Sequence, residues 1–455
     1  MALDRQIARL SKILVDSEKI SFDEAQARLR SLTLEVVVGA GAFSPAAHAA
    51  ALTAVSVGSR TFVGGVRLTG AVHGRAITHL PLRAESLAEA AHLVGTSEFE
   101  GTASRRIVIG MDDAGAGWAV SPWWTGWSAG TAKPSEARPV KGDNPLPGIA
   151  AGAMAVGVAF EAERSQFVDF TGQVDLWPVG AGQVAPRFQE TFLPGALWLV
   201  GLGNLGQAYL WALSALPFAD PGSVSLVLQD RDSISEENWA TSVLVKAETY
   251  GALKTKVAED WASAKGFRVR RIDRWLTARD RVEDDDPRLA LSGVDKVSTR
   301  QLMAKFGFDC IVDGGLGRTA TDFDRYRVTV FDKNRSIDHH FAGLADAPAR
   351  QEPPNDDAYR CLEREVGACG AAEVGGASVA VPYVSAVAGA IVVARVIAIT
   401  SGCECVVNEV GILSHMADRK VAELSATEGR GIGHAGKPAV EVSENGQRLT
   451  LRESL

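Results

Sequence analysis

The stretch LWLVGLGNLGQAYLWALSAL, residues 197–216, reads as an apolar strand, a glycine turn and a helix in direct succession. The turn contains the three glycines of the GxGxxG pattern, Gly201, Gly203 and Gly206, with Asn204 among them. Glycines at these positions let a phosphate approach the backbone, and the N–H groups at the start of the helix form an anion site. These four residues are therefore the first candidates for binding a nucleotide.

The next predicted strand supports the same interpretation. The segment SVSLVLQD ends in Asp230, at about the distance where an acidic residue binds the ribose hydroxyls in folds of this kind. A glycine turn made only for packing is the alternative, and these residues do not distinguish NAD from ATP.

The N-terminal part of the chain repeats the succession of strand, turn and helix. When LEVVVGAGAFSPAAHAAALTAV, which begins at Leu34, is laid over the second stretch, Gly39 and Gly41 meet its first two glycines. Ser44 takes the place of the third glycine, and Pro45 follows it. We therefore expect the first copy to be inactive and a single nucleotide to bind, in the second copy.

A second pair of segments strengthens the duplication. The segment 143–163 resembles the segment 378–398, with Pro147 over Pro382 and a helix rich in Ala, Gly and Val after each. The predicted fold is therefore α/β, with two Rossmann-like units in tandem, each a largely parallel sheet flanked by helices. The predicted ranges are a helical segment at 1–36, an inactive unit at 37–190, an active unit at 191–415 with a long crossover loop at 331–377, and a C-terminal tail at 416–455.

Composition excludes several broad classes of protein. The chain has 455 residues and a net charge of -8, which argues against a broad surface for nucleic acid. Five unevenly spaced cysteines do not make a disulfide framework, so a cytoplasmic location is expected. The longest apolar stretch, 379–399, is interrupted by Tyr383, Ser385 and Arg395, which favours a buried helix over a membrane span.

The residues after Asp230 point to ATP rather than NAD. The run DRDSISEENWATSVL and the later GALKTK resemble the ThiF/MoeB-type adenylyltransferase superfamily, to which the ubiquitin-activating enzymes belong. The family pattern is D-x-D-x-V-x-x-S-N-L-N-R-Q followed by G-x-x-K. The positions that match are Asp230, Asp232, Ile234 and Asn238, and then Gly251 and Lys254. The resemblance implies that Asp230 binds the ATP ribose and that Asn238 and Lys254 bind phosphates. A solvated surface lysine is the alternative for Lys254.

The sequence departs from the family in two places. The arginine within the loop would fall at Thr241. The magnesium aspartate is the fourth residue of a D-x-x-D-N run after the fourth strand, and laying this run over IVDGGLGR puts Asp313 at its first aspartate and Leu316 at its second. Asp313 is the predicted magnesium ligand, through a shifted turn, and Arg318 is a candidate for the lost charge.

The N-terminus offers another basic residue. The segment LDRQIARL resembles the family's R-Y-x-R-Q-I opening, whose arginine reaches into the ATP site of the partner unit. Arg5 is therefore a catalytic candidate, and an ordinary arginine on a helix surface is the alternative.

The crossover loop contains the candidate nucleophile. In YRCLEREVGACGAAEVGG, Cys369 falls where the family has its thioester or persulfide cysteine, and Cys361 is the second choice. A buried, inert cysteine is the alternative. A zinc site would have to recruit Cys361, Cys369, Cys403 and Cys405 without any C-x-x-C pair. The histidines His339 and His340 are ligand or acid–base candidates, although loop histidines are usually just solvated.

The small size and unequal halves resemble the activating enzymes of bacterial ubiquitination-like operons, which are associated with antiphage defence. The resemblance implies ATP and Mg2+ as cofactors, a ubiquitin-like protein whose C-terminal carboxylate is adenylated, and a conjugating-enzyme-like partner; a homodimer is left open. The alternatives are a sulfur-carrier adenylyltransferase, an NAD(P)-dependent oxidoreductase and a non-catalytic scaffold for a ubiquitin-like protein. The oxidoreductase gives no reason for Lys254, whereas Thr241 and Leu316 favour the scaffold.

Overall fold

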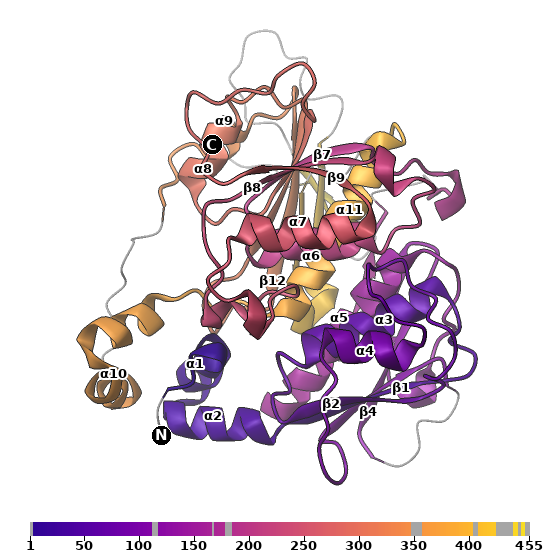
Figure 1. Ribbon diagram of the computed structural model, residues 1–455, viewed down its shortest axis with the longest axis vertical. Helices are drawn as coiled ribbons and strands as arrows, with labels where there is room; N and C mark the ends of the chain where they lie inside the picture. The colour runs from indigo at the N-terminus through magenta and orange to yellow at the C-terminus, as the bar shows by residue number, and fades with distance from the viewer. Residues whose placement is uncertain are drawn as a thin grey trace.

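Two β-sheets organise the chain, with helices around and between them (Figure 1). The computed structural model describes residues 3–111, 117–165, 168–177, 184–346, 357–403, 408–424, 440–444 and 447–450. We call the part that contains the first sheet the first unit and the part that contains the second sheet the second unit. The α/β class predicted from the sequence is confirmed.

The first sheet has the strand order β2-β1-β3-β4-β5-β6. The first four of these strands are parallel, and β5 and β6 are added in antiparallel fashion. The strands are β1 (Thr33–Val38), β2 (Gly65–Gly70), β3 (Arg105–Ile109), β4 (Ala119–Thr125), β5 (Ser128–Ala132) and β6 (Gln173–Asp175).

The second sheet has the order β9-β8-β7-β10-β11-β12-β13-β14-β15-β16. The strands from β9 to β11 are parallel, as crossover connections through helices require. Those from β11 to β16 are antiparallel, so this sheet is mixed rather than largely parallel as predicted. The strands are β7 (Ala196–Val200), β8 (Ser225–Gln229), β9 (Arg268–Ile272), β10 (Leu289–Ser292), β11 (Cys310–Leu316), β12 (Arg325–Asp332), β13 (Asn408–Ile412), β14 (Lys420–Leu424), β15 (Val440–Glu444) and β16 (Gln447–Thr450).

The helices fall into a buried set and a peripheral set. The buried set is α3 (Pro45–Gly58), α5 (Pro145–Arg164), α6 (Asn204–Ser214) and α11 (Pro382–Thr400). The peripheral set is α1 (Ala8–Glu18), α2 (Phe22–Ser31), α4 (Leu87–Val94), α7 (Lys254–Lys265), α8 (Val297–Met303), α9 (Ile337–His340) and α10 (Asp357–Gly376).

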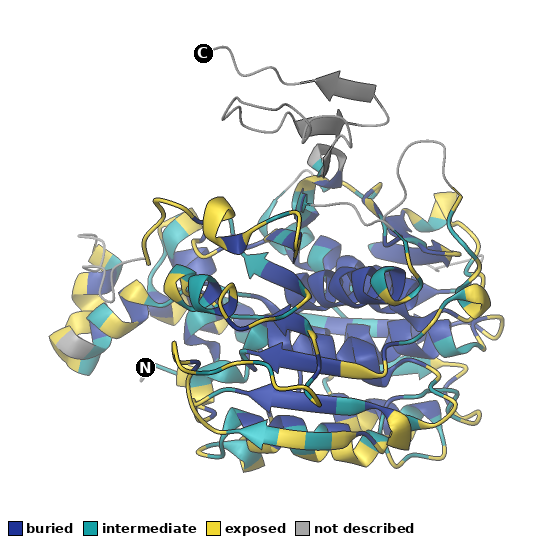
Figure 2. Ribbon diagram, turned by 90° about the horizontal axis from the view of Figure 1, so that it is seen from above, coloured by how far each residue is buried: buried dark blue, intermediate teal, exposed yellow. Residues whose placement is uncertain are grey.

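The four buried helices join the two units through one core. Helix α5 packs on the first sheet, α11 packs on the second, and the two helices pack on each other. Figure 2 shows buried helices in the middle of the molecule. Within the first unit, α5 lies very close to α3 because it has glycines at that contact: a Cβ on Gly148 or Gly152 would lie 2.2 or 2.3 Å from a carbonyl oxygen of α3. The helices α5 and α11 are long and apolar enough to cross a membrane, but 83% and 89% of their tested residues are buried inside the structure.

Some predicted boundaries shift. The N-terminal helices end at Ser31 and β1 begins at Thr33, before the predicted limit at residue 36. Residues 420–424, 440–444 and 447–450 of the predicted tail are strands that extend the second sheet. Pro145, rather than Pro147, begins α5 in the way that Pro382 begins α11.

The peripheral helix α10, which carries the candidate cysteines, is attached to α1. Tyr359 Oη donates to Asp16 Oδ1 at 2.8 Å near the start of α10. At its end, Lys12 Nζ donates to the carbonyl oxygens of Gly375 and Ala377. Burial lowers the pKa of Lys12. The N-terminal helix thereby holds both ends of α10.

Candidate functional site: a cavity at the carboxyl ends of the parallel strands

A cavity of about 670 Å³ lies at the carboxyl ends of the parallel strands of the second sheet. It is lined by Val200 at the end of β7, Gln229 at the end of β8, Gly293 after β10 and Leu316 at the end of β11. The strand order reverses direction between β7 and β10, and such a switch point is where open α/β sheets bind ligands. The topology therefore places the cavity where a nucleotide is expected.

The glycine turn between β7 and α6 forms one wall of the cavity. Gly201 has a φ of +84°, which favours glycine, and Gly203 has open space where a Cβ would project. Gly206 does not line the cavity: a Cβ there would lie 2.1 Å from the carbonyl oxygen of Gly201. Of the three predicted glycines, Gly201 and Gly203 face the cavity, and Gly206 instead allows the helix to pack beneath the turn.

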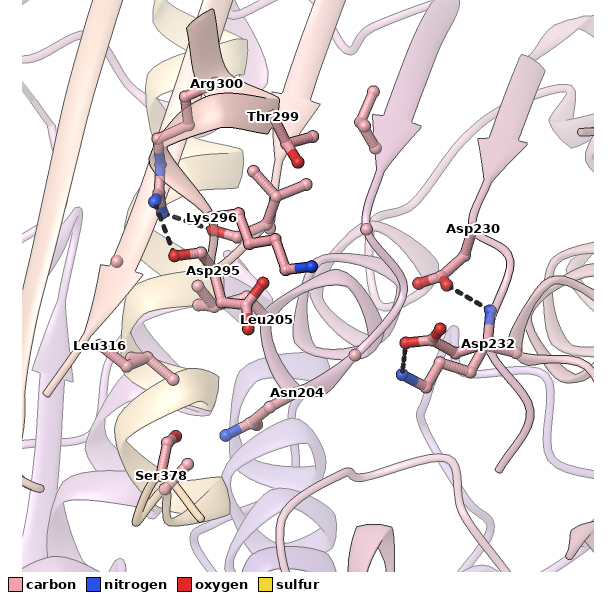
Figure 3. A pocket seen from close by; sticks show the side chains of 18 of the residues that line it. Asn204, Leu205, Asp230, Asp232, Asp295, Lys296, Thr299, Arg300, Leu316 and Ser378 are labelled. Carbon is pink, nitrogen blue, oxygen red and sulfur yellow. Dashed lines mark hydrogen bonds and ion pairs between the residues drawn. The ribbon is translucent and has the colours of Figure 1, made fainter. Parts of the chain in front are cut away.

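Asn204, the first residue of α6, points into the cavity (Figure 3). Its side-chain oxygen and nitrogen are both buried, and neither has a hydrogen-bond partner among the described residues. Buried polar atoms in native proteins nearly always have a partner. A ligand in the cavity would supply the missing one.

The predicted ribose and phosphate residues lie together on the opposite side of the turn. Asp230 accepts a hydrogen bond from the backbone of Leu202 at 2.6 Å and another from the backbone of Asp232 at 2.8 Å. Lys254, the first residue of α7, donates to Asp232 Oδ2 at 2.9 Å (Figure 3). Asn238, which ends a short 3₁₀ helix (Glu236–Asn238), also lines the cavity.

Positive charge exceeds negative charge around the cavity. Six basic and three acidic residues line it, which favours a polyanion such as a polyphosphate. The basic residues are Arg9, Lys254, Arg274, Lys296, Arg300 and Arg318, and the acidic residues are Asp230, Asp232 and Asp295.

Asp313 is not in a position to bind a metal ion at this site. Its side chain is fully buried in β11, outside the lining of the cavity. One carboxylate oxygen accepts from Ser292 Oγ at 2.6 Å and Arg300 Nε at 2.9 Å, and the other accepts from Arg327 Nη2 at 2.7 Å. Two guanidinium groups already neutralise this carboxylate, and their charge would repel a metal cation. The predicted magnesium role of Asp313 is therefore wrong.

The order of the strands identifies a better candidate. The fourth strand of the second unit along the chain is β10, not β11, and the run that follows its apolar residues is Ser292-Gly293-Val294-Asp295-Lys296. Asp295 is the fourth residue of that run, lines the cavity and is labelled beside Lys296 in Figure 3. The search for D-x-x-D-N missed it because neither the first aspartate nor the asparagine is present, although counting strands would have found it.

The N-terminal helix contributes a different arginine from the one predicted. Arg5 is exposed on the 3₁₀ turn Arg5–Ile7 and does not line the cavity. Arg9, about one helical turn later, lines the cavity and donates through Nη2 to Glu237 Oε2 at 3.3 Å. The candidate from this segment is therefore Arg9 instead of Arg5.

The position that lost the family's arginine and the residue proposed to replace its charge both line the cavity. Thr241, at the position of the family's loop arginine, is buried and lines the cavity. Arg318, which follows β11, is exposed and lines the other side.

The residues predicted around the crossover lie away from the cavity lining or outside the described part of the chain. Cys369 is in α10, but its side chain lies outside the described residues, as does all of Cys405. Cys361 is exposed and accepts a hydrogen bond from Arg364 at 3.2 Å. Cys403 is half-buried. Within the residues that the structure describes, no group of three or more His, Cys, Asp or Glu side chains could hold a metal ion.

The two crossover histidines are in α9 and do not line the cavity. His340 packs edge-on against Phe331 and Phe341, and burial, with the nearby charge of Arg327, lowers its pKa. His339 is exposed.

Solved structures share limited similarity with the chain. The protein MccB of E. coli, solved with ATP, has 15% sequence identity and a TM-score of 0.30, covering 48% of this chain and 60% of its own. The E. coli tRNA N6-threonylcarbamoyladenosine dehydratase TcdA has 16% identity and a TM-score of 0.30, covering 46% of this chain and 86% of its own.

Comparison by sequence is more informative. The family described as the BilD N-terminal domain matches residues 33–171, and the family described as the BilD C-terminal domain matches residues 193–403. A relative from Collimonas sp. (strain OK412), the bacterial E1-like protein BilD, is 31% identical over 414 residues, which cover 86% of this chain and 87% of the relative. The chain is therefore a member of the BilD family of bacterial E1-like proteins.

Proposed function

We propose that the chain uses ATP to adenylate the C-terminal carboxylate of a ubiquitin-like protein. The observation that carries this proposal is the convergence of the glycine turn, Asp230 and Lys254 on one cavity with an excess of positive charge. The similarity to a bacterial E1-like protein supports the adenylation chemistry. An NAD(P)-dependent oxidoreductase would account for Asp230 but not for Lys254 or the surrounding basic residues.

In the proposed reaction, a carboxylate oxygen of the substrate attacks the α-phosphorus of ATP. The new bond makes an acyl adenylate, the bond to the β-phosphate oxygen breaks, and pyrophosphate leaves with the electron pair. Asp230 would hold the ribose hydroxyls, while Lys254 and the N–H groups at the start of α6 would stabilise charge on the phosphates. Positioning and charge neutralisation of this kind provide most of the rate enhancement in phosphoryl transfer chemistry.

The residues of the cavity fit one magnesium ion carried in with the nucleotide. Mg2+ is usually bound by one or two carboxylates together with substrate phosphates, so a cluster of three protein ligands is not needed. Asp295 would be the protein ligand, since its carboxylate lines the cavity and Asp313 is occupied by arginines. The ion would neutralise negative charge on the phosphates.

Exchange of labelled pyrophosphate into ATP tests the proposed reaction. Exchange that depends on an added ubiquitin-like protein is the expected result. Exchange with a sulfur carrier of cofactor synthesis instead would transfer the proposal to that class of partner. Binding of NADH without ATP binding would contradict the proposal, and binding of the ubiquitin-like protein without any exchange would favour a scaffold.

We further propose that the acyl group passes from the adenylate to Cys369 and then to a conjugating-enzyme-like partner. The thiolate would attack the acyl carbonyl, forming a thioester as AMP leaves. Cys369→Ala is expected to keep pyrophosphate exchange and to lose any reducible adduct on non-reducing gels, with Cys361→Ala as the matched control. An adduct that persists in Cys369→Ala and disappears in Cys361→Ala would assign the step to Cys361.

A further inference from the structure

A buried arginine of the first unit reaches across to the loop that forms one side of the cavity. Arg60 follows α3 and is 5% exposed. Its Nε donates to the carbonyl oxygen of Ser242 at 3.2 Å, and its Nη2 donates to those of Val243 at 3.1 Å and Val245 at 2.9 Å. Three carbonyl oxygens of the loop are thus bound by one guanidinium group from the other unit.

The bound loop begins at the cavity. Thr241 and Ser242 line the cavity, so the first carbonyl that Arg60 binds belongs to a residue of the cavity wall. The loop is also bound to α6, the helix that follows the glycine turn, because the backbone of Leu244 donates to Gln207 Oε1 at 3.0 Å. The position of the wall therefore depends on contacts from both units.

Among the residues that the structure describes, no carboxylate forms an ion pair with Arg60. Its acceptors in the described part of the chain are carbonyl and hydroxyl oxygens, namely those of the loop together with Ser56 and Ser59. Burial lowers its pKa to about 10, which leaves the group charged at neutral pH. Burying an unbalanced charge is unfavourable, and its field acts strongly through a medium of low dielectric constant. A polyanion in the adjacent cavity would provide the balancing charge.

We propose that Arg60 is a positioning residue of the nucleotide site, through which the first unit holds the 241–245 loop and supplies positive charge to the phosphates. The charge compensates for Thr241, which stands in that loop where an arginine would otherwise be. Arg60 acts through the loop because it is not itself among the residues that line the cavity. This inference rests on the proposed binding of ATP.

The test compares ATP with adenosine, which lacks the phosphates. In the full-length Arg60→Met protein we expect ATP to bind at least tenfold more weakly and adenosine to bind within twofold of wild type. Arg60→Lys, which keeps the charge but cannot bind three carbonyls at once, should give an intermediate loss for ATP. Methylguanidinium added to an Arg60→Ala protein should recover part of the ATP affinity. Equal weakening of ATP and adenosine, or unchanged ATP binding, would overturn the proposal.

A second readout does not depend on the ligand. Amide hydrogen exchange at residues 241–245 should become at least several-fold faster in Arg60→Met and Arg60→Lys without any nucleotide. The control is Thr53→Ala, which removes another contact between α3 and the second unit, the hydrogen bond from Trp211 Nε1 to Thr53 Oγ1 at 3.0 Å, without changing charge. It should leave loop exchange and ATP affinity unchanged.

These measurements separate the two proposals. Wild-type protein that binds ATP while Arg60→Met binds it equally well would overturn the role of Arg60 and leave the proposed function intact. Wild-type protein that binds no ATP would overturn both. Unchanged loop exchange in both Arg60 variants would overturn the positioning role by itself, and if Arg60→Met does not fold, Arg60→Lys provides the same comparison.

Discussion

The glycine turns of the two units begin alike and end differently. In the first unit, a Cβ on Gly39 would lie 2.3 Å from the carbonyl oxygen of Gly110, so a neighbouring loop sits directly on the turn. Ser44 then caps α3 with its own side chain by accepting a hydrogen bond from the backbone of Ala47. In the second unit, Gly203 precedes the first residue of α6 and provides no side-chain cap, and space is open beside it. The free N–H groups of α6 remain available to an anion, whereas those of α3 are partly satisfied from within.

The comparison extends to one carboxylate in each sheet that is bound by two arginines. Asp313 is fully buried between Arg300 and Arg327, whereas Glu35 of β1 is partly exposed between Arg67 and Arg106. Asp313→Ala should lower the free energy of unfolding by about 3–5 kcal/mol, because it leaves two cations without their partner. Glu35→Ala should lower it by about 1 kcal/mol or less. Urea denaturation measures both losses, and equal losses would break the comparison.

The next largest effect concerns the open site itself. Lys254→Ala and Asp230→Ala should each remove about 2–4 kcal/mol of transition-state stabilisation, the scale of losing a charged or oriented contact. The matched control is Lys256→Ala, which removes an exposed lysine of the same helix that pairs with Asp260. Pyrophosphate exchange provides the measurement. If Lys254→Ala and Lys256→Ala exchange at the same rate, Lys254 has no role at the phosphates.

Acid should lower the free energy of unfolding through the protonation of His48. This residue is buried in α3, and its Nδ1 accepts a hydrogen bond from the backbone of Ile77 at 2.8 Å. Burial lowers the pKa of His48 from 6.5 to about 4. The unfolded chain therefore binds the extra proton between these two values, so stability is complete above pH 6.5 and falls as the pH drops toward 4. The expected loss is about 2–3 kcal/mol.

Thermal unfolding between pH 7.5 and 4.5 measures this loss. His48→Gln, which can still accept the hydrogen bond but does not titrate, should show a shallower dependence on pH than wild type. Identical profiles for the two proteins would show that other groups control acid stability.

The smallest effect tests the two turns directly. A methyl group at Gly203 would have no atom within 4 Å, so the Gly203→Ala protein should fold normally. The added methyl group would occupy the space in which we propose that a phosphate binds. ATP should bind about tenfold more weakly, a loss on the order of 1.4 kcal/mol. Gly41→Ala, whose methyl group would lie 3.9 Å from Gly110, should leave ATP binding unchanged. Isothermal titration should give one ATP per chain, and two equivalent sites would contradict an inactive first unit.

The sequence predicted the parts of the fold that depend on local pattern. Apolar strands, glycine turns and the two apolar helices predicted after Pro147 and Pro382, the first of which begins at Pro145, follow from hydrophobic runs and from the conformational limits of glycine and proline. Asp230 was predictable from its place directly after a strand, and Lys254 from the resemblance to the G-x-x-K pattern of the ThiF/MoeB-type family.

Other features depend on contacts between distant segments, which no local pattern records. The sequence analysis proposed Asp313 and did not consider Asp295, because only the sheet order shows that β10, rather than β11, lies beside β7 and its glycine turn. Arg5 lies on the 3₁₀ turn before α1 and Arg9 lies within α1, and the sequence pattern does not show which of them reaches the cavity. Arg60 could not be found at all, since its acceptors lie more than 180 residues away along the chain.

The packing of α5 of the first unit against α11 of the second unit makes each half depend on the other for burial of its core. A gene cut down to its second half would encode α6 and α11 with their apolar faces turned toward water. Such a product would be expected to associate with itself or be degraded before it could bind anything. The first half is therefore required for folding whether or not it binds a nucleotide, and selection cannot discard it.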